Sequence, residues 1–207
     1  MIGRLIFCLF FLLLPSFSFA QDFTLQHFQQ LKTNPPLKKQ FEAVVRQTVH
    51  QLYFPDEPVP SLKLDSWFSK PLPLFVTVKK KDRIRACMGS VLPQTAHLAD
   101  ELKQKIRLAF LQDIRNPPIK KEELEGSRVY VTAVGALVPV SHPENLNPFR
   151  EGIYLKWGGK EALYLPGEAK TLAYALKQIR GKAGISSREP ALIYKFKTSS
   201  VEVDLFK

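Results

Sequence analysis

The sequence predicts an α+β fold, with helices packed on a mostly antiparallel sheet. Some runs alternate apolar and polar side chains with a period of two residues, which is typical of strands. Other runs repeat apolar residues at spacings of three and four, which is typical of helices. Along the chain these runs are ordered helix, hairpin, helix, strand, hairpin, helix and two closing strands. This order favours a mostly antiparallel sheet covered by helices.

The first twenty residues have the three parts of a secretory signal. Residues 1–4 are a short basic start, residues 5–14 are an unbroken apolar run, and Ser18 and Ala20 are small residues suited to a cleavage site. The apolar run is too short to span a bilayer as a helix. We therefore predict a signal peptide over residues 1–20, cleavage after Ala20, and a periplasmic or secreted protein. The alternative is an uncleaved anchor at the membrane surface.

Residues 21–37 are polar and end in Asn34-Pro35-Pro36, so we expect a flexible N-terminal arm there. The rest of the chain is long enough to bury one substantial core. Residues 38–207 contain no long flexible linker. They are therefore predicted to form a single domain.

Each element of that domain has its own pattern. Residues 41–52 have helical spacing, and residues 55–73 contain five prolines, which predicts an irregular connection. Residues 74–79 alternate cleanly and reach a polar turn at residues 80–82, which predicts a hairpin. The remaining predicted elements are a strand at 83–88, a helix at 98–110, a strand at 129–134, a hairpin of 153–157 and 162–165, a helix at 169–179, and strands at 192–196 and 201–205.

The formal net charge of +11 narrows the classes of partner. Nucleic acid binds basic surfaces, but an export signal argues against it and the chain has no recognisable nucleic-acid motif. An anionic surface or an acidic protein outside the cytoplasm fits better. The simplest interpretation is solvated charge that keeps the domain soluble.

Cys87 is the only cysteine outside the leader. In a regular strand it shares a face with Arg85, opposite the apolar Ala86 and Met88. A neighbouring guanidinium lowers the pKa of a thiol, which makes Cys87 a candidate catalytic nucleophile and Arg85 a candidate binding residue. The alternative is a small residue packed in the fold, because free cysteine is often buried.

Asp113 and Arg115 precede a Pro-Pro segment. They either pair to fix that loop or lie beside Cys87 as binding residues. The four histidines lack ligand spacing, and the chain contains no Cys-x-x-Cys, so we predict no metal site and no cofactor. Nucleophile-elbow, phosphate-loop and dinucleotide motifs are missing as well.

Several segments of the chain carry a family resemblance. The segment Ile84-Arg85-Ala86-Cys87-Met88-Gly89 follows Phe75-Val76-Thr77. It is similar to the pattern Leu-Arg-Gly-Cys-Ile-Gly after a strand ending in Val-Thr, which is typical of the AMMECR domain family. Further matches are Asp113-Ile114-Arg115-Asn116-Pro117-Pro118-Ile119, Leu163-Tyr164-Leu165-Pro166 and Lys182-Ala183-Gly184-Ile185. Ala86 departs from the family glycine, so the chain resembles a divergent, exported member.

The resemblance implies an α+β domain with a small helical lobe and a cleft near the cysteine segment. The biochemical activity of the family is not established. Its bacterial members are associated with a mediator-of-cell-motility-like protein, which resembles metal-dependent dioxygenases, so a dioxygenase-like partner is a possible one.

The two functional hypotheses differ in what Cys87 does. In the first, the chain is an accessory or binding module whose cleft at Arg85 and Cys87, with Asp113 and Arg115, takes an unknown protein or a small anionic ligand. In the alternative, the chain is a cysteine-dependent enzyme that uses Cys87 as a thiolate.

Overall fold

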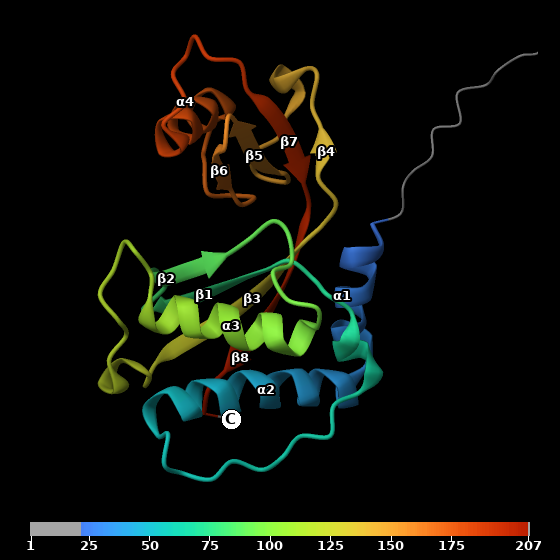
Figure 1. Ribbon diagram of the computed structural model, residues 1–207, viewed down its shortest axis with the longest axis vertical. Coiled ribbons are helices and arrows are strands. Elements are labelled where there is room, and N and C mark those ends of the chain that lie inside the picture. The colour runs from blue at the N-terminus through green and yellow to red at the C-terminus, as the bar shows by residue number, and fades with distance from the viewer. Residues whose placement is uncertain (1–21, 207) are drawn as a thin grey trace, which may run out of the picture.

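The computed structural model describes residues 22–206. The predicted signal peptide lies outside the described residues. The described chain forms two lobes, a larger one with three helices and a smaller one with a single helix (Figure 1). No helix in residues 22–206 has the length and apolar character needed to cross a membrane. The fold class is α+β, as predicted, with the strands divided between two antiparallel four-stranded sheets.

The expected flexible arm at residues 21–37 is wrong. Helix α1 (Phe23–Thr33) occupies most of it and buries Leu25, Phe28 and Leu31 in the main core. Their spacing of three residues is helical, and the polar residues between them hid it. The apolar stripe therefore makes this segment part of the domain.

The Pro-Pro pair begins a helix rather than breaking the chain. Asn34 ends α1, and its side chain accepts a hydrogen bond from the Leu37 N–H as the N-cap of α2 (Pro35–Tyr53). Proline suits the first helical position, where its missing N–H would have no helical partner. α2 consequently begins three residues before the predicted domain boundary.

The large lobe is built on the sheet β2-β1-β3-β8. Its strands are β1 (Leu74–Lys80), β2 (Arg83–Gly89), β3 (Ser127–Val134) and β8 (Thr198–Asp204). Helices α1, α2 and α3 (Leu98–Leu111) share one core with the inward side chains of these strands. β2 and β8 are the edges of this sheet.

Two aromatic residues hold the irregular connection before β1 against the large lobe. Trp67 and Phe68 lie in the short helix η1 (Ser66–Ser69) and are buried. The Trp67 ring stacks on His27, and its Nε1–H donates to the His27 carbonyl at 3.1 Å. This contact joins the connection to α1.

The small helical lobe that the resemblance implied contains a sheet as well as a helix. Its sheet has the order β4-β7-β5-β6, and α4 (Leu172–Ala183) packs on it around a separate core. The strands are β4 (Val138–Pro139), β5 (Gly152–Trp157), β6 (Lys160–Tyr164) and β7 (Leu192–Phe196), and the remaining short helices of the chain are η2 (Lys121–Glu123) and η3 (Pro143–Asn145). Gly158 and Gly159 both have positive φ, as a two-residue hairpin turn requires.

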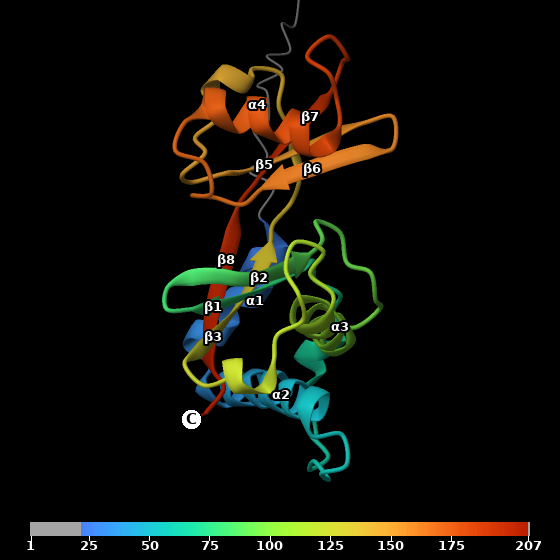
Figure 2. The same ribbon diagram turned by 90° about the vertical axis from the view of Figure 1, so that its left-hand side faces the viewer.

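The chain passes between the lobes twice, from β3 to β4 and from β7 to β8 (Figure 2). The Gly135 N–H donates to the Lys197 carbonyl at 2.9 Å and ties the two passages together. A third apolar cluster, around Phe75, Tyr154 and Phe196, joins the lobes. The cysteine segment of β2 lies against this junction.

Candidate functional site

A β-bulge in β2 separates the two site residues that the sequence placed together. Val78 pairs with Ala86 and Lys79 pairs with Ile84, so Arg85 is an extra residue without a partner on β1. A bulge interrupts the alternation of side chains between the two faces. Arg85 reaches η2, whereas Cys87 contacts Thr77. The prediction that Arg85 and Cys87 share a face is therefore wrong.

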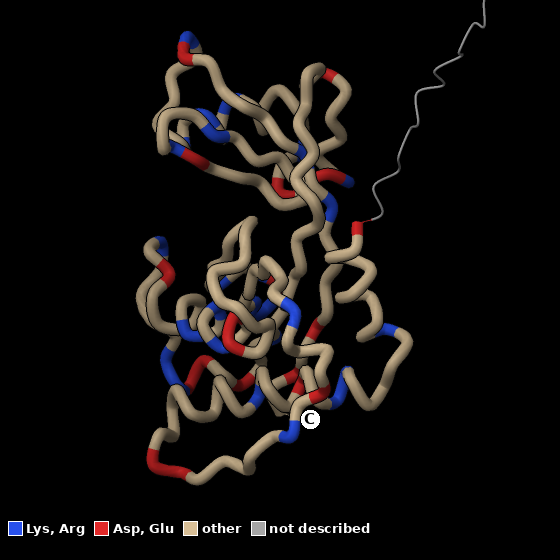
Figure 3. Tube along the Cα trace, turned by 45° about the vertical axis from the view of Figure 1, so that its right-hand side comes forward, with Lys and Arg blue, Asp and Glu red and all other residues tan. Residues whose placement is uncertain are grey.

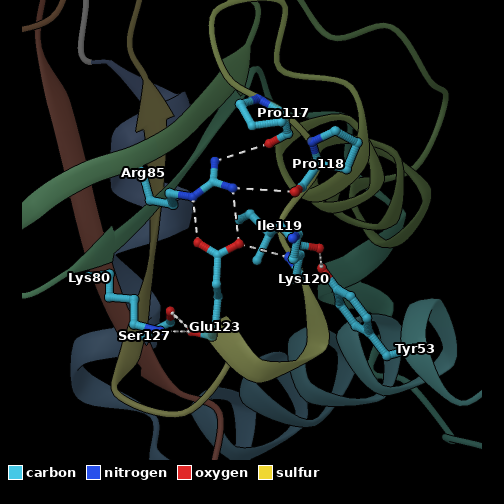
Figure 4. Close-up of polar contacts among 9 residues, drawn as sticks. All are labelled: Tyr53, Lys80, Arg85, Pro117, Pro118, Ile119, Lys120, Glu123 and Ser127. Atoms are coloured by element: carbon cyan, nitrogen blue, oxygen red, sulfur yellow. Dashed lines mark hydrogen bonds and ion pairs between the residues drawn. The ribbon is translucent and has the colours of Figure 1, made fainter.

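Arg85 binds the chain itself (Figure 4). Its Nε donates to Glu123 Oε1 at 2.7 Å and its Nη2 to Oε2 at 3.1 Å, a two-point pairing of guanidinium and carboxylate. Its remaining bonds go to the carbonyls of Pro117 at 3.1 Å and Pro118 at 3.3 Å. The hydrogen bond from Arg85 lowers the pKa of Glu123 to about 2.

Three further hydrogen bonds hold the segment around Glu123. The Ser127 hydroxyl and the Lys80 ammonium both donate to the Glu123 carbonyl, at 2.6 and 3.1 Å. The Tyr53 hydroxyl, from α2, donates to the Ile119 carbonyl at 2.7 Å. Burial raises the pKa of Tyr53 to about 12. Arg85 is thus one part of a network that fixes residues 117–127 against the sheet and α2.

Cys87 is held by its backbone at the edge of the sheet. Its N–H donates to Asp113 Oδ2 at 2.7 Å, and its carbonyl accepts from Arg115 Nη2 at 2.5 Å. Its thiol accepts a hydrogen bond from the Thr77 hydroxyl at 3.2 Å. Burial raises the pKa of Cys87, and the smaller effects of Thr77 and Arg115 do not reverse it. The expected lowering of the thiol pKa by Arg85 is therefore wrong.

Asp113 and Arg115 act as one unit that fixes the loop and also lies beside Cys87. Asp113 Oδ1 accepts from the Arg115 N–H at 2.9 Å and Nε at 3.0 Å, which fixes the loop. The same pair takes the outward N–H and C=O of Cys87, as a neighbouring strand would. Burial of Asp113 opposes its ionisation, but the hydrogen bonds from Arg115 and Cys87 outweigh it and hold its pKa at about 2. We call this pair the edge clamp.

A cleft between the lobes begins beyond the edge clamp. Its volume is about 500 Å³. The large lobe contributes residues at and after the end of β2, and the small lobe contributes residues of β5 and β6. The lining residues are Gly89, Ser90, Val91, Leu92, Gln94, Tyr154, Lys156, Glu161, Ala162 and Leu163. Cys87 packs in the same junction cluster as Val91, Tyr154 and Leu163, so it lies beside this cleft.

A buried ion pair supports the large-lobe wall of the cleft, and sequence reasoning missed it. Glu101 and Lys105, one turn apart on α3, are 0% and 1% exposed, with 3.1 Å between Oε1 and Nζ. Glu101 Oε2 accepts from the N–H groups of Gln94 and Thr95, both at 2.8 Å, and Lys105 donates to Gln94 Oε1 at 2.8 Å. The signal was a Glu and a Lys four residues apart, but that spacing is also common on exposed helices.

A second hollow lies at the far end of the large lobe. It has a volume of about 370 Å³ and is lined by the end of α2, residues 57–60 and the C-terminal Leu205 and Phe206. None of the predicted site residues lines it. Within residues 22–206, no three His, Cys, Asp or Glu side chains gather in a way that could hold a metal ion.

Comparison with known proteins identifies the family. The AMMECR1 family model matches residues 42–203, so the chain belongs to the AMMECR1 family. A protein of Thermotoga maritima is 32% identical over 146 residues, which cover 69% of this chain and 82% of that protein. A protein of Clostridium acetobutylicum is 30% identical over 125 residues, which cover 59% of this chain but only 26% of that longer protein.

A solved structure has the same fold. The crystal structure of an uncharacterised protein from Pyrococcus horikoshii matches with a TM-score of 0.69 and 21% identity. The match covers 79% of this chain and 90% of that one. The family is one of uncharacterised proteins.

Proposed function

We propose that this chain is an exported accessory module that binds a partner, an unidentified protein or a small anionic ligand, in the cleft between its lobes. The observation that carries this proposal is the position of the cleft. It opens directly beyond Cys87 and takes its walls from both lobes. Ligand sites often occupy such junctions, where apolar walls meet a few polar groups.

The lining has the mixture of groups that a binding site needs. Val91, Leu92 and Leu163 offer apolar contacts, and Leu92 is 62% exposed although it is a large apolar residue. Lys156 adds a positive charge on the opposite wall. An exposed apolar side chain inside a cleft is a feature that a partner can cover.

The state of Cys87 favours binding over catalysis. A thiol attacks as the thiolate, and burial raises the pKa of Cys87, so the thiolate is scarce near neutral pH. Arg85, which was expected to activate the thiol, is engaged with Glu123 and two carbonyls. In this proposal Arg85 positions the loop, and Arg115 with Asp113 holds the edge beside the cleft.

The leader sequence and the family resemblance support an accessory role outside the cytoplasm. Residues 1–20 have the pattern of a signal peptide. By resemblance, a dioxygenase-like protein is one possible partner, provided that it is exported too. The net charge of +11 favours an acidic partner or an anionic surface.

The test compares two matched surface substitutions. The tagged chain is recovered from the exported fraction of the producing cells as wild type, Leu92→Asp and Phe149→Asp. Phe149 is 61% exposed, nearly the same as Leu92, but does not line the cleft. We expect a protein, or a small molecule seen by native mass spectrometry, to accompany the wild type and Phe149→Asp and to be lost from Leu92→Asp. Equal recovery with all three chains would contradict binding in the cleft.

The cysteine-enzyme alternative makes a different prediction. A catalytic thiolate should react with iodoacetamide rapidly, with a midpoint below the usual thiol pKa. We expect slow alkylation of Cys87 that increases only at high pH. Fast alkylation at neutral pH in the native protein would favour the enzyme.

A further inference from the structure

Two edge strands, one from each sheet, border the cleft. β2 ends the large sheet and β6 ends the small sheet. The cleft is lined by Gly89 at the end of β2 and by Glu161, Ala162 and Leu163 of β6. An edge strand has backbone groups that its own sheet does not satisfy, and these can pair with another chain.

The hydrogen-bond pattern of β2 shows which backbone groups point outward. The Ser90 N–H donates inward, to the Leu74 carbonyl at 3.1 Å. The N–H and C=O of Cys87 point outward, to the edge clamp. Because an antiparallel ladder repeats every two residues, the backbone of Gly89 also points away from β1. Gly89 is therefore the first outward position beyond the edge clamp.

The position of Gly89 requires glycine. A Cβ there would lie 2.4 Å from both the Leu74 carbonyl oxygen and the Phe75 ring. The residue consequently has no side chain that could screen its backbone from the cleft. The edge clamp already shows what this edge accepts one position earlier, where a carboxylate oxygen takes the N–H and a guanidinium donates to the C=O.

Charge complementarity indicates the kind of chain that would fit. From Val138 to Lys197, the small lobe has ten Lys and Arg against five Asp and Glu. Lys and Arg positions are spread over both lobes (Figure 3). Lys156 and Glu161, which are cross-strand partners, both line the cleft, and the Glu161 carboxylate accepts a hydrogen bond from the Tyr154 hydroxyl. The positive surplus therefore belongs to the small lobe as a whole. An acidic partner gains from this surplus on approach and in the complex.

We propose that the occupant of the cleft is an extended, acidic segment of a partner polypeptide that adds to the edge of β2 at Gly89. This inference rests on the proposed function and names the partner of the same site. Main-chain hydrogen bonds to Gly89 hold the segment. Its alternate side chains contact Leu92 and Leu163, and its carboxylates face Lys156. Peptide recognition by strand addition combines these two kinds of contact.

The test uses three synthetic peptides on the purified chain without its leader. The probe is a capped six-residue peptide that alternates glutamate and valine. The first control is the same peptide with its central valine amides N-methylated, which cannot pair with an edge, and the second replaces glutamate by lysine. Binding is followed by the amide NMR shifts of residues 87–94 and by the hydrogen exchange of Gly89.

We expect the glutamate–valine peptide to bind, to shift the Gly89 amide and to slow its exchange. N-methylation should weaken binding about five- to tenfold, the effect of losing a hydrogen bond or two, and the lysine peptide should bind more weakly still. No binding of the glutamate–valine peptide would overturn the inference, and so would equal binding of the N-methylated or the lysine peptide. The proposed function would survive either result if Leu92→Asp still lost a partner that Phe149→Asp retained.

Discussion

The half of β2 before Cys87 and the half after it differ in what satisfies their outer edge. At Cys87 the edge clamp does so by binding the backbone N–H and C=O, and two residues earlier the Arg85 side chain is bound to Glu123. After Cys87, Gly89 faces a cleft, and the loop beyond it is supported from beneath by Glu101 and Lys105. The edge is occupied by the edge clamp at Cys87, and we call the half up to Cys87 the closed half; it is accessible at Gly89, and we call the half after Cys87 the open half.

This difference separates structural from functional candidates within a single strand. A guanidinium that makes four hydrogen bonds inside the chain has little left to offer a ligand. A glycine at an accessible edge offers both a donor and an acceptor. In the proposed complex, Arg85 and the edge clamp therefore hold the site in place, and Gly89 contacts the partner.

The largest loss of stability is expected when the buried Glu101–Lys105 pair, which supports the open half, is broken. Lys105→Met leaves Glu101 as a buried charge without its cation, which should lower the free energy of unfolding by about 3 kcal/mol or more. Denaturant titration measures this. Lys103→Met, on the exposed side of the same helix, is the control and should change stability by less than about 0.5 kcal/mol. Similar losses in both variants would mean that the buried pair is not the support.

The second-largest loss of stability is expected at Arg85, in the closed half. Arg85→Lys keeps the charge but loses the two-point pairing with Glu123 and the bonds to Pro117 and Pro118, which should cost about 1.5–3 kcal/mol. The matched control is Arg83→Lys, an exposed position on the same strand. Denaturant titration gives the stability, and hydrogen exchange should show the loss concentrated in residues 117–127. A loss of partner binding without a loss of stability would instead make Arg85 a binding residue.

Acid should weaken the closed half. Asp113 and Glu123 both have pKa values of about 2, below their ordinary values. A lowered folded pKa stabilises the fold above the ordinary pKa of about 4, and this contribution is lost as the pH falls toward 2. Stability should therefore decline between pH 4.5 and 2, and Asp113→Asn with Glu123→Gln should flatten the decline. An unchanged slope in the double variant would show that other carboxylates cause it.

The smallest effect on stability is expected inside the cleft. Leu92 is largely exposed, so Leu92→Ser should change the free energy of unfolding by less than about 0.5 kcal/mol. Thermal unfolding checks this, and the same variant should lose affinity for the glutamate–valine peptide. A large loss of stability would mean that Leu92 packs in the fold and is not available to a partner.

Several predictions made from the sequence alone are confirmed. The strands of both hairpins and the closing strands lie within three residues of the predicted bounds, because a period of two residues directly indicates a strand with one buried face. The family resemblance is confirmed by the family model over residues 42–203. The wrong predictions concern features that depend on contacts between segments distant in the sequence. The helix α1 was missed because its few apolar residues are separated by polar ones and are buried only by distant segments of the main core.

The sequence by itself determined the α+β class, the positions of the strands, and the loop that brings Asp113 and Arg115 together, because these depend on local periodicity and turn residues. The tertiary structure alone decided that Arg85 and Cys87 point apart, since the bulge exists only in the pairing of β2 with β1. It also decided that Glu101 and Lys105 are buried and that Gly89 borders a cleft. Burial and pairing are properties of contacts between distant segments, and single residues do not encode them.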